Sequence, residues 1–173
     1  MSTTFNGAFI KVADINTVAD FWNTFNSLPS CSDLHTNTVV LSSKRVVAYS
    51  IFRKGVTPEW EDKTNQVGGE WECRDSMSAE SFATMFYDLA LCAVNNELDD
   101  AVVGVRCVNK CNKTRIVHKI EVWNGVASKR TIGDIALQLS PYTPKHLEFA
   151  YTSHNAKQTH ARDYRLSVSK TVH

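Results

Sequence analysis

The sequence describes an ordinary globular chain with little net charge. Its 173 residues suit a single domain, residues 1–173, with room for a sizeable core. The formal net charge of +1 excludes a strongly basic coat for nucleic acid, so binding to RNA or DNA must come from a local site. We expect no membrane span and no secretory signal, because no apolar stretch approaches about 18 residues and the first residues lack the required pattern.

The five cysteines predict free thiols rather than disulfides. An odd count without a repeated short spacing argues against a disulfide framework. Cys107 and Cys111, with His118 nearby, leave a zinc site conceivable, but free thiols in a reducing compartment are favoured. We therefore predict no metal and no cofactor, and we expect the protein in the cytoplasm, with the nucleus left open.

The first predicted helix follows Thr17. Thr17 and Asp20 resemble a capping box, in which each side chain satisfies a backbone N–H group of the first turn. Phe21 and Phe25 recur at helical spacing and should face the core. Trp22 lies at the rim of that stripe, where it can either complete the core or stay exposed.

The second predicted helix, residues 78–95, has more apolar surface than one buried face needs. Its second apolar strip implies deeper burial or a partner surface, and the periodicity alone does not choose between them. A third helix, residues 130–139, is predicted less strongly because Gly133 interrupts it. The core stripe of the second helix is Phe82, Met85, Phe86, Leu89 and Ala93, and the second strip is Tyr87, Leu91 and Val94.

Runs rich in β-branched residues predict an antiparallel sheet. The polar residues 109–113 separate two of these runs and predict a long hairpin. The resulting class is α+β, a curved antiparallel sheet with helices packed on its convex face and a binding cleft on its concave face. The predicted strands are Val46–Phe52, Gly69–Cys73, Val102–Val108, Arg115–Trp123, Leu147–Thr152 and Tyr164–Ser169.

Trp60 and Glu61 carry the strongest chemical signal in the chain. A carboxylate can accept both N–H groups of a guanine edge, and an indole can stack on the ring. Methylation at N7 makes guanine cationic, which adds cation–π attraction. Taken alone, the pair is better explained as a half-buried structural tryptophan beside a surface glutamate. No phosphate loop, nucleophile elbow or paired-histidine helix is visible, so we predict no enzymatic activity.

Several segments resemble, in chain order, the motifs of the eukaryotic translation initiation factor 4E family. The resemblance covers most of the chain and implies a protein that binds the 7-methylguanosine cap of messenger RNA. It also implies recruitment of that RNA for translation initiation through a scaffold protein. The matching segments are Thr17–Trp22, Tyr49–Asp62, Gly68–Gly69 with Trp71, Val102–Arg106 and Tyr151–His154.

The resemblance assigns four residues to the cap guanine. Trp60 would stack on one face of the base and Glu61 would accept hydrogen bonds from its edge. Phe5 stands where the family usually has the second stacking tryptophan. Trp123 would lie near the N7 methyl group.

Five basic residues are assigned to the cap phosphates and the nucleotides that follow. Arg106 and Lys119 would face the phosphates, with Arg115 competing for the role of Lys119. Lys157 and Arg162 belong to a segment that resembles the family's lid over the cap.

Two departures from the family pattern affect the phosphate side. Glu70 stands where the family commonly has arginine, and Gly104 stands where it often has asparagine. These departures leave two alternatives open, a cap-binding translational repressor or a scaffold-binding module with a weakened cap pocket. A cap-processing enzyme is disfavoured because no metal-binding carboxylate motif accompanies Glu61.

The resemblance also gives the second apolar strip a role. The family binds a scaffold of the initiation factor 4G type, or a 4E-binding protein, on the face opposite the cap. Such partners insert a short amphipathic helix, and an apolar patch with a central tryptophan suits that contact. The matching positions are Val18, Trp22, Tyr87, Asp88 and Leu91.

Overall fold

A five-stranded antiparallel sheet forms the centre of the protein. The computed structural model describes residues 4–5 and 9–155, with side chains from residue 9 onward. The strand order is β5-β7-β8-β6-β9, so the longest strands lie in the middle. The strands are β5 (Ala48–Phe52), β6 (Gly69–Asp75), β7 (Val102–Asn109), β8 (His118–Asn124) and β9 (Phe149–Ser153).

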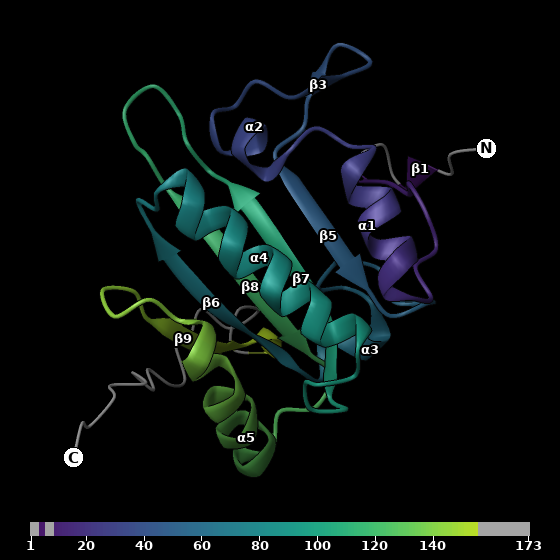
Figure 1. The fold of residues 1–173 in the computed structure, drawn as a ribbon. Coiled ribbons are helices and arrows are strands. Elements are labelled where there is room, and N and C mark those ends of the chain that lie inside the picture. The colour runs from purple at the N-terminus through teal and green to yellow at the C-terminus, as the bar shows by residue number, and fades with distance from the viewer. Residues whose placement is uncertain (1–3, 6–8, 156–173) are drawn as a thin grey trace.

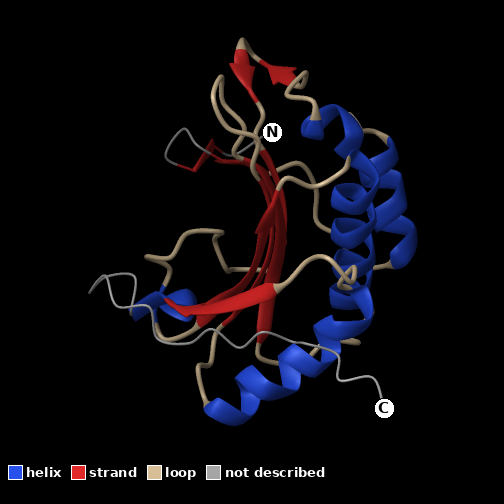
Figure 2. Ribbon diagram, turned by 90° about the vertical axis from the view of Figure 1, so that its left-hand side faces the viewer, coloured by secondary structure: helices blue, strands red, loops and turns tan. Residues whose placement is uncertain are grey.

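Most of the helices cover one face of this sheet. Figure 2 shows the sheet edge-on, bowed toward a layer that contains the long helices. The longest helix, α4, crosses β7 and β8, with α1 and α2 near one of its sides (Figure 1). The helices are α1 (Val18–Asn26), α2 (Cys31–His35), α3 (Lys63–Gln66), α4 (Ala79–Val94), α5 (Lys129–Leu139) and the 3-10 turn η1 (Ser140–Tyr142).

Capping side chains fix where the helices begin. The Thr17 side chain accepts from the Asp20 N–H at 3.0 Å, and Asp20 accepts in return from the Thr17 N–H, which completes the predicted capping box. Ser30, Ser78 and Ser128 cap α2, α4 and α5 in the same way, each accepting from the residue three positions on.

The core lies between the helix layer and the sheet. Phe21 and Phe25 of α1 are buried, as predicted, and so are the inward residues of α5. From α4, the buried members of the predicted stripe are Phe82, Met85, Phe86 and Leu89, whereas Ala93 is half-buried. Trp71 and Val122 enter the same core from the sheet.

Two short hairpins accompany the main sheet. β1 (Thr4–Phe5) pairs with β2 (Phe9–Ile10), and β3 (Val40–Leu41) pairs with β4 (Lys44–Arg45). Ser42 and Ser43 connect β3 to β4 with positive φ angles, as tight hairpin turns require.

Several predicted boundaries were wrong. Arg115 was placed in a strand, but it lies in the loop before β8, where the Asn112 side chain accepts from its N–H at 3.0 Å. Short α2 and α3, and both small hairpins, were not predicted. The predicted strand Tyr164–Ser169 lies outside the described residues. None of the described helices is long and apolar enough to span a bilayer.

Candidate functional site

Alternation along β8 separates the core from the opposite, concave face of the sheet. Ile120 and Val122 are buried in the core cluster. Lys119, Glu121 and Trp123 therefore point to the other face, away from the helices. The strand register then determines which residues of the neighbouring strands join them there.

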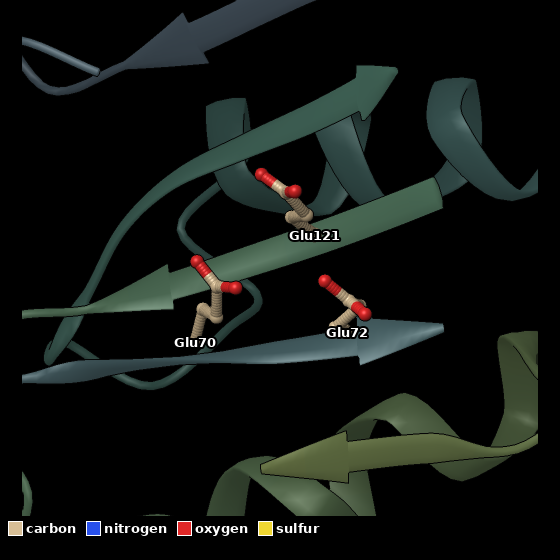
Figure 3. A group of neighbouring side chains, drawn as sticks. All are labelled: Glu70, Glu72 and Glu121. Carbon is tan, nitrogen blue, oxygen red and sulfur yellow. The ribbon is translucent and has the colours of Figure 1, made fainter. Parts of the chain in front are cut away.

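The neighbouring strands add charged residues to the concave face. On β6, Glu70 lies beside Trp123 and Glu72 lies beside Glu121. On β7, Arg106 lies on the other side of Glu121. Figure 3 shows the carboxylates of Glu70, Glu72 and Glu121 projecting to the same side of their two strands. One oxygen from each lies within 4.8 Å of the others.

The loop that carries Trp60 and Glu61 is held by Asn65 and Asp62. Asn65 is fully buried, and its side-chain amide donates to the carbonyls of Thr57 at 2.8 Å and Glu59 at 2.7 Å. Asp62 accepts from the Thr57 N–H and hydroxyl, both at 3.0 Å. Burial opposes the charge on Asp62, but hydrogen bonds from Thr57 and Thr64 outweigh it and hold the pKa of Asp62 below its ordinary value. The loop is thereby closed on itself.

His154 connects this loop to the concave face. Its Nδ1–H donates to the backbone carbonyl of Asn65 at 2.7 Å. The same imidazole lies against Trp123, with ring centroids 4.7 Å apart, and its Nε2 lies 3.5 Å from a Glu70 carboxylate oxygen. His154 is fully buried. The Trp60 loop therefore lies beside the part of the sheet that carries Trp123.

Trp123 is enclosed by its neighbours. Its side chain is only 4% exposed, and its Nε1–H donates to Glu121 Oε2 at 3.1 Å. The ring of Phe52 packs edge-on against it, with centroids 5.5 Å apart. Phe52 can lie there because Gly104 has no side chain, since a Cβ at Gly104 would come within 2.4 Å of the Phe52 ring. By contrast, Trp60 is 41% exposed and Glu61 is exposed too.

Arg106 and Lys119, two of the five predicted phosphate cations, are paired with carboxylates. Lys119 Nζ contacts Glu72 and also donates to Glu121 Oε1 at 2.7 Å. Burial opposes the charge on Lys119, but Glu121 and Glu72 outweigh it and raise the pKa of the ammonium group. Arg106 Nη1 lies 3.9 Å from Glu121 Oε2, and its guanidinium lies over the Phe9 ring of β2 at 5.8 Å.

Comparison with known proteins decides the family. The family model described as eukaryotic initiation factor 4E matches residues 2–168. The chain belongs to the eukaryotic initiation factor 4E family. The translation initiation factor NCBP of Triticum aestivum is 30% identical over 150 residues, which are 82% of this chain and 54% of that protein.

Solved structures of the initiation factor 4E family share the fold. The eIF4E-3 of Ascaris suum with an m7G cap superposes with a TM-score of 0.70 at 21% identity, covering 89% of this chain and 83% of that one. The C. elegans eIF4E-3 with the 4E-binding protein Mextli and a cap analog gives 0.68 at 20% identity, covering 89% and 84%. The chain spans about half the length of the curated relatives that it matches.

The structure describes only some of the remaining residues that were predicted for the initiation factor 4E cap site. The backbone of Phe5 lies in β1, in register with Phe9, whose ring covers Arg106. Arg115 is exposed in the β7–β8 loop, so Lys119, and not Arg115, is the one that points from β8 to the concave face. Lys157 and Arg162 lie outside the described residues.

Glu72 and Glu121 are the site residues that the sequence analysis missed. Both contact Lys119, and Glu121 also contacts Trp123 and Arg106. The signal was present in the alternation of β8, because a two-residue period that puts Lys119 and Trp123 on one face puts Glu121 between them. The paired carboxylates are invisible in the sequence because Glu72 comes from another strand.

On the opposite face, the predicted scaffold residues lie on α1 and α4, and all of them are partly exposed. Trp22 is 40% exposed and Val18 is exposed to a similar degree, both on α1. The Trp22 ring lies 6.0 Å from the ring of Tyr87 on α4. Asp88 follows Tyr87 in the chain, Leu91 lies about one helical turn beyond Tyr87, and both are half-buried. The second apolar strip of α4 is thus only partly covered by the rest of the described chain.

Proposed function

We propose that this chain binds the 7-methylguanosine cap of messenger RNA and recruits the RNA for translation initiation through a scaffold protein. It acts as a binding protein and not as an enzyme. Residues 1–173 form a cap-binding domain, and we expect it to act in the cytoplasm, with the nucleus left open. Family membership supports this proposal, and so do the solved relatives, whose structures contain an m7G cap or a 4E-binding protein.

One observation carries the proposal for this chain's own residues. The loop with the exposed pair Trp60 and Glu61 is connected through Asn65 and His154 to the concave face at Trp123. An exposed indole and an exposed acceptor-only carboxylate, held beside the sheet, suit a cationic purine with N–H donors on its edge. Trp60 supplies the stacking surface and Glu61 reads the edge of the base. Phe5 supplies the second stacking surface.

Retention on immobilised 7-methylguanosine tests this assignment. We expect the wild-type protein to be retained and to be released by free 7-methylguanosine monophosphate, but not by guanosine monophosphate. Trp60→Ala should abolish retention, Trp60→Phe should keep part of it, and Glu61→Gln should weaken it. Circular dichroism shows whether each variant is folded. Normal retention of folded Trp60→Ala would contradict the pocket assignment.

The scaffold partner occupies the opposite face. The patch of Val18, Trp22, Tyr87, Asp88 and Leu91 fits a short amphipathic helix, because it combines a central half-exposed indole with flanking aliphatic surface. A partner of the initiation factor 4G type or a 4E-binding protein supplies that helix.

A further inference from the structure

Carboxylates already occupy the end of the concave face to which a phosphate chain was assigned. Glu70, Glu72 and Glu121 form the closest carboxylate group of the described residues, and the Lys119 ammonium contacts two of them. Among the described residues of this region, the cations that accompany these three carboxylates are Arg106, Lys119 and Arg74, which pairs with Lys119 across β6 and β8. A phosphate that approached Lys119 would therefore meet the two carboxylates that already contact its ammonium group.

Glu121 is the central residue of this network. Its Oε1 accepts from Lys119 at 2.7 Å, and its Oε2 accepts from the Trp123 indole at 3.1 Å while facing Arg106 at 3.9 Å. Only 5% of the side chain is exposed, so these contacts are shielded from water and from salt. A phosphate could gain Lys119 only by displacing a buried carboxylate, which would then lose a partner.

The same charges favour the cationic part of a cap. N7-methylated guanine carries a positive charge, which a carboxylate attracts, whereas a carboxylate repels phosphate oxygens. The same carboxylate, that of Glu121, accepts the hydrogen bond of the Trp123 indole and contacts the Lys119 ammonium group.

We propose that this protein, if it binds the cap as proposed above, recognises the methylated base with little contribution from the phosphate chain, and that Glu121 with Glu72 sets this specificity. The ligand class is a cap whose phosphates leave the pocket without forming ion pairs to Lys119 and Arg106. Glu72 and Glu121 act by holding the two cations away from the ligand.

A series of ligands that differ only in phosphate number tests this proposal. Calorimetric titration of the wild-type protein with 7-methylguanosine and its mono-, di- and triphosphates should give affinities within about threefold of one another. Raising the salt concentration should change them little. A rise of about tenfold or more from nucleoside to triphosphate would overturn the specificity proposal while leaving cap binding intact. Absence of binding by every ligand, nucleoside included, would instead overturn the proposed function, and this inference with it.

Two substitutions and one control sharpen the test. In Glu121→Gln, the ratio of triphosphate affinity to nucleoside affinity should rise about tenfold, because Lys119 and Arg106 lose a competing carboxylate. Glu72→Gln should change the ratio in the same direction, and it serves if Glu121→Gln fails to fold, since Glu72 is more exposed. Glu97→Gln, an exposed carboxylate beyond the end of α4, should leave the ratio unchanged. An unchanged ratio in both folded variants would contradict the role of Glu121 and Glu72.

Discussion

His154 donates from Nδ1 to the backbone carbonyl of Asn65 at 2.7 Å, although the two residues are 89 positions apart in the chain. This contact joins the end of β9 to α3, and through the Asn65 side chain it reaches the loop of Trp60 and Glu61. Buried hydrogen bonds therefore help to hold that loop in place.

Replacing Asn65 should therefore weaken ligand binding by loosening the loop that carries Trp60 and Glu61. In Asn65→Ala, the carbonyls of Thr57 and Glu59 lose their side-chain donor, at a cost of about 1–3 kcal/mol in the free energy of unfolding. We expect weaker cap retention and faster proteolysis within residues 57–62. Gln66→Ala is the matched control, because that exposed side chain forms one bond to the Glu61 carbonyl. Urea unfolding and the resin assay measure both effects, and unchanged retention would show that the loop is held by other contacts.

Gly104 and Gly133 should respond in opposite ways to the same substitution. Gly104→Ala places a Cβ against the Phe52 ring, which must move, so unfolding should become easier by about 1–3 kcal/mol. Gly133 lies in α5 with open space around it, so Gly133→Ala should stabilise the protein by about 0.5–1 kcal/mol. Urea unfolding of the two variants provides the comparison. Equal effects would mean that Phe52 does not need the space at Gly104.

Trp22 should contribute to partner binding and not to cap binding. Trp22→Ala removes the central half-exposed indole of the patch, which should weaken binding of a helical scaffold peptide by about 2 kcal/mol, or about thirtyfold. Cap retention should be unaffected. Leu137→Ala, an exposed apolar side chain on α5, is the matched control and should leave peptide affinity unchanged. If Trp22→Ala unfolds the protein, the residue belongs to the core and the proposed partner surface is wrong.

The stacked pair His35 and His118 should make stability sensitive to mild acid. Their rings lie 4.0 Å apart and nearly parallel. Burial, followed by the charge of His35, lowers the pKa of His118 below its ordinary value of 6.5. The unfolded imidazole therefore takes up a proton at a pH where the folded one stays neutral, so stability is full above about pH 6.5 and falls as the pH drops through the folded pKa.

Urea unfolding at pH 7.5 and pH 5.5 measures this dependence. His118→Gln removes the titrating group and should make the free energy of unfolding less dependent on pH in this window. His146→Gln, which replaces an exposed histidine, should keep the wild-type dependence. The lowered pKa values of Asp20 and Asp62 act only below about 3.8, outside the window. An identical slope in His118→Gln would rule out His118 as its source.

The sequence predicted what depends on local patterns. The capping box at Thr17 and the apolar spacing of Phe21 and Phe25 are properties of neighbouring residues, and both helix and core face were confirmed. The prediction that Arg115 lies in a strand was wrong. The Asn112 side chain accepts a hydrogen bond from the Arg115 N–H and forms a turn, which overrides the β-rich composition of the segment. Helix α3 was missed because four residues are too few for an apolar stripe.

Contacts between strands could not be predicted in the same way. The pairing of Lys119 with Glu72 needs the register of β6 against β8, which the sequence does not state. The family resemblance named Lys119 and Trp123, but it did not indicate that Glu121 would hold both. The cap-site assignments themselves stay predictions until ligands are tested.

The position of Glu121 between Lys119 and Trp123 has a consequence for how this site can change over evolutionary time. A relative that loses Lys119 while keeping Glu121 would leave a buried carboxylate with fewer partners. A relative that loses Glu121 instead would remove a partner of both Lys119 and the Trp123 indole. Positions 72, 119 and 121 should therefore vary together among close homologues. A lineage would pass between phosphate-independent and phosphate-dependent recognition by paired substitutions, with few viable single steps.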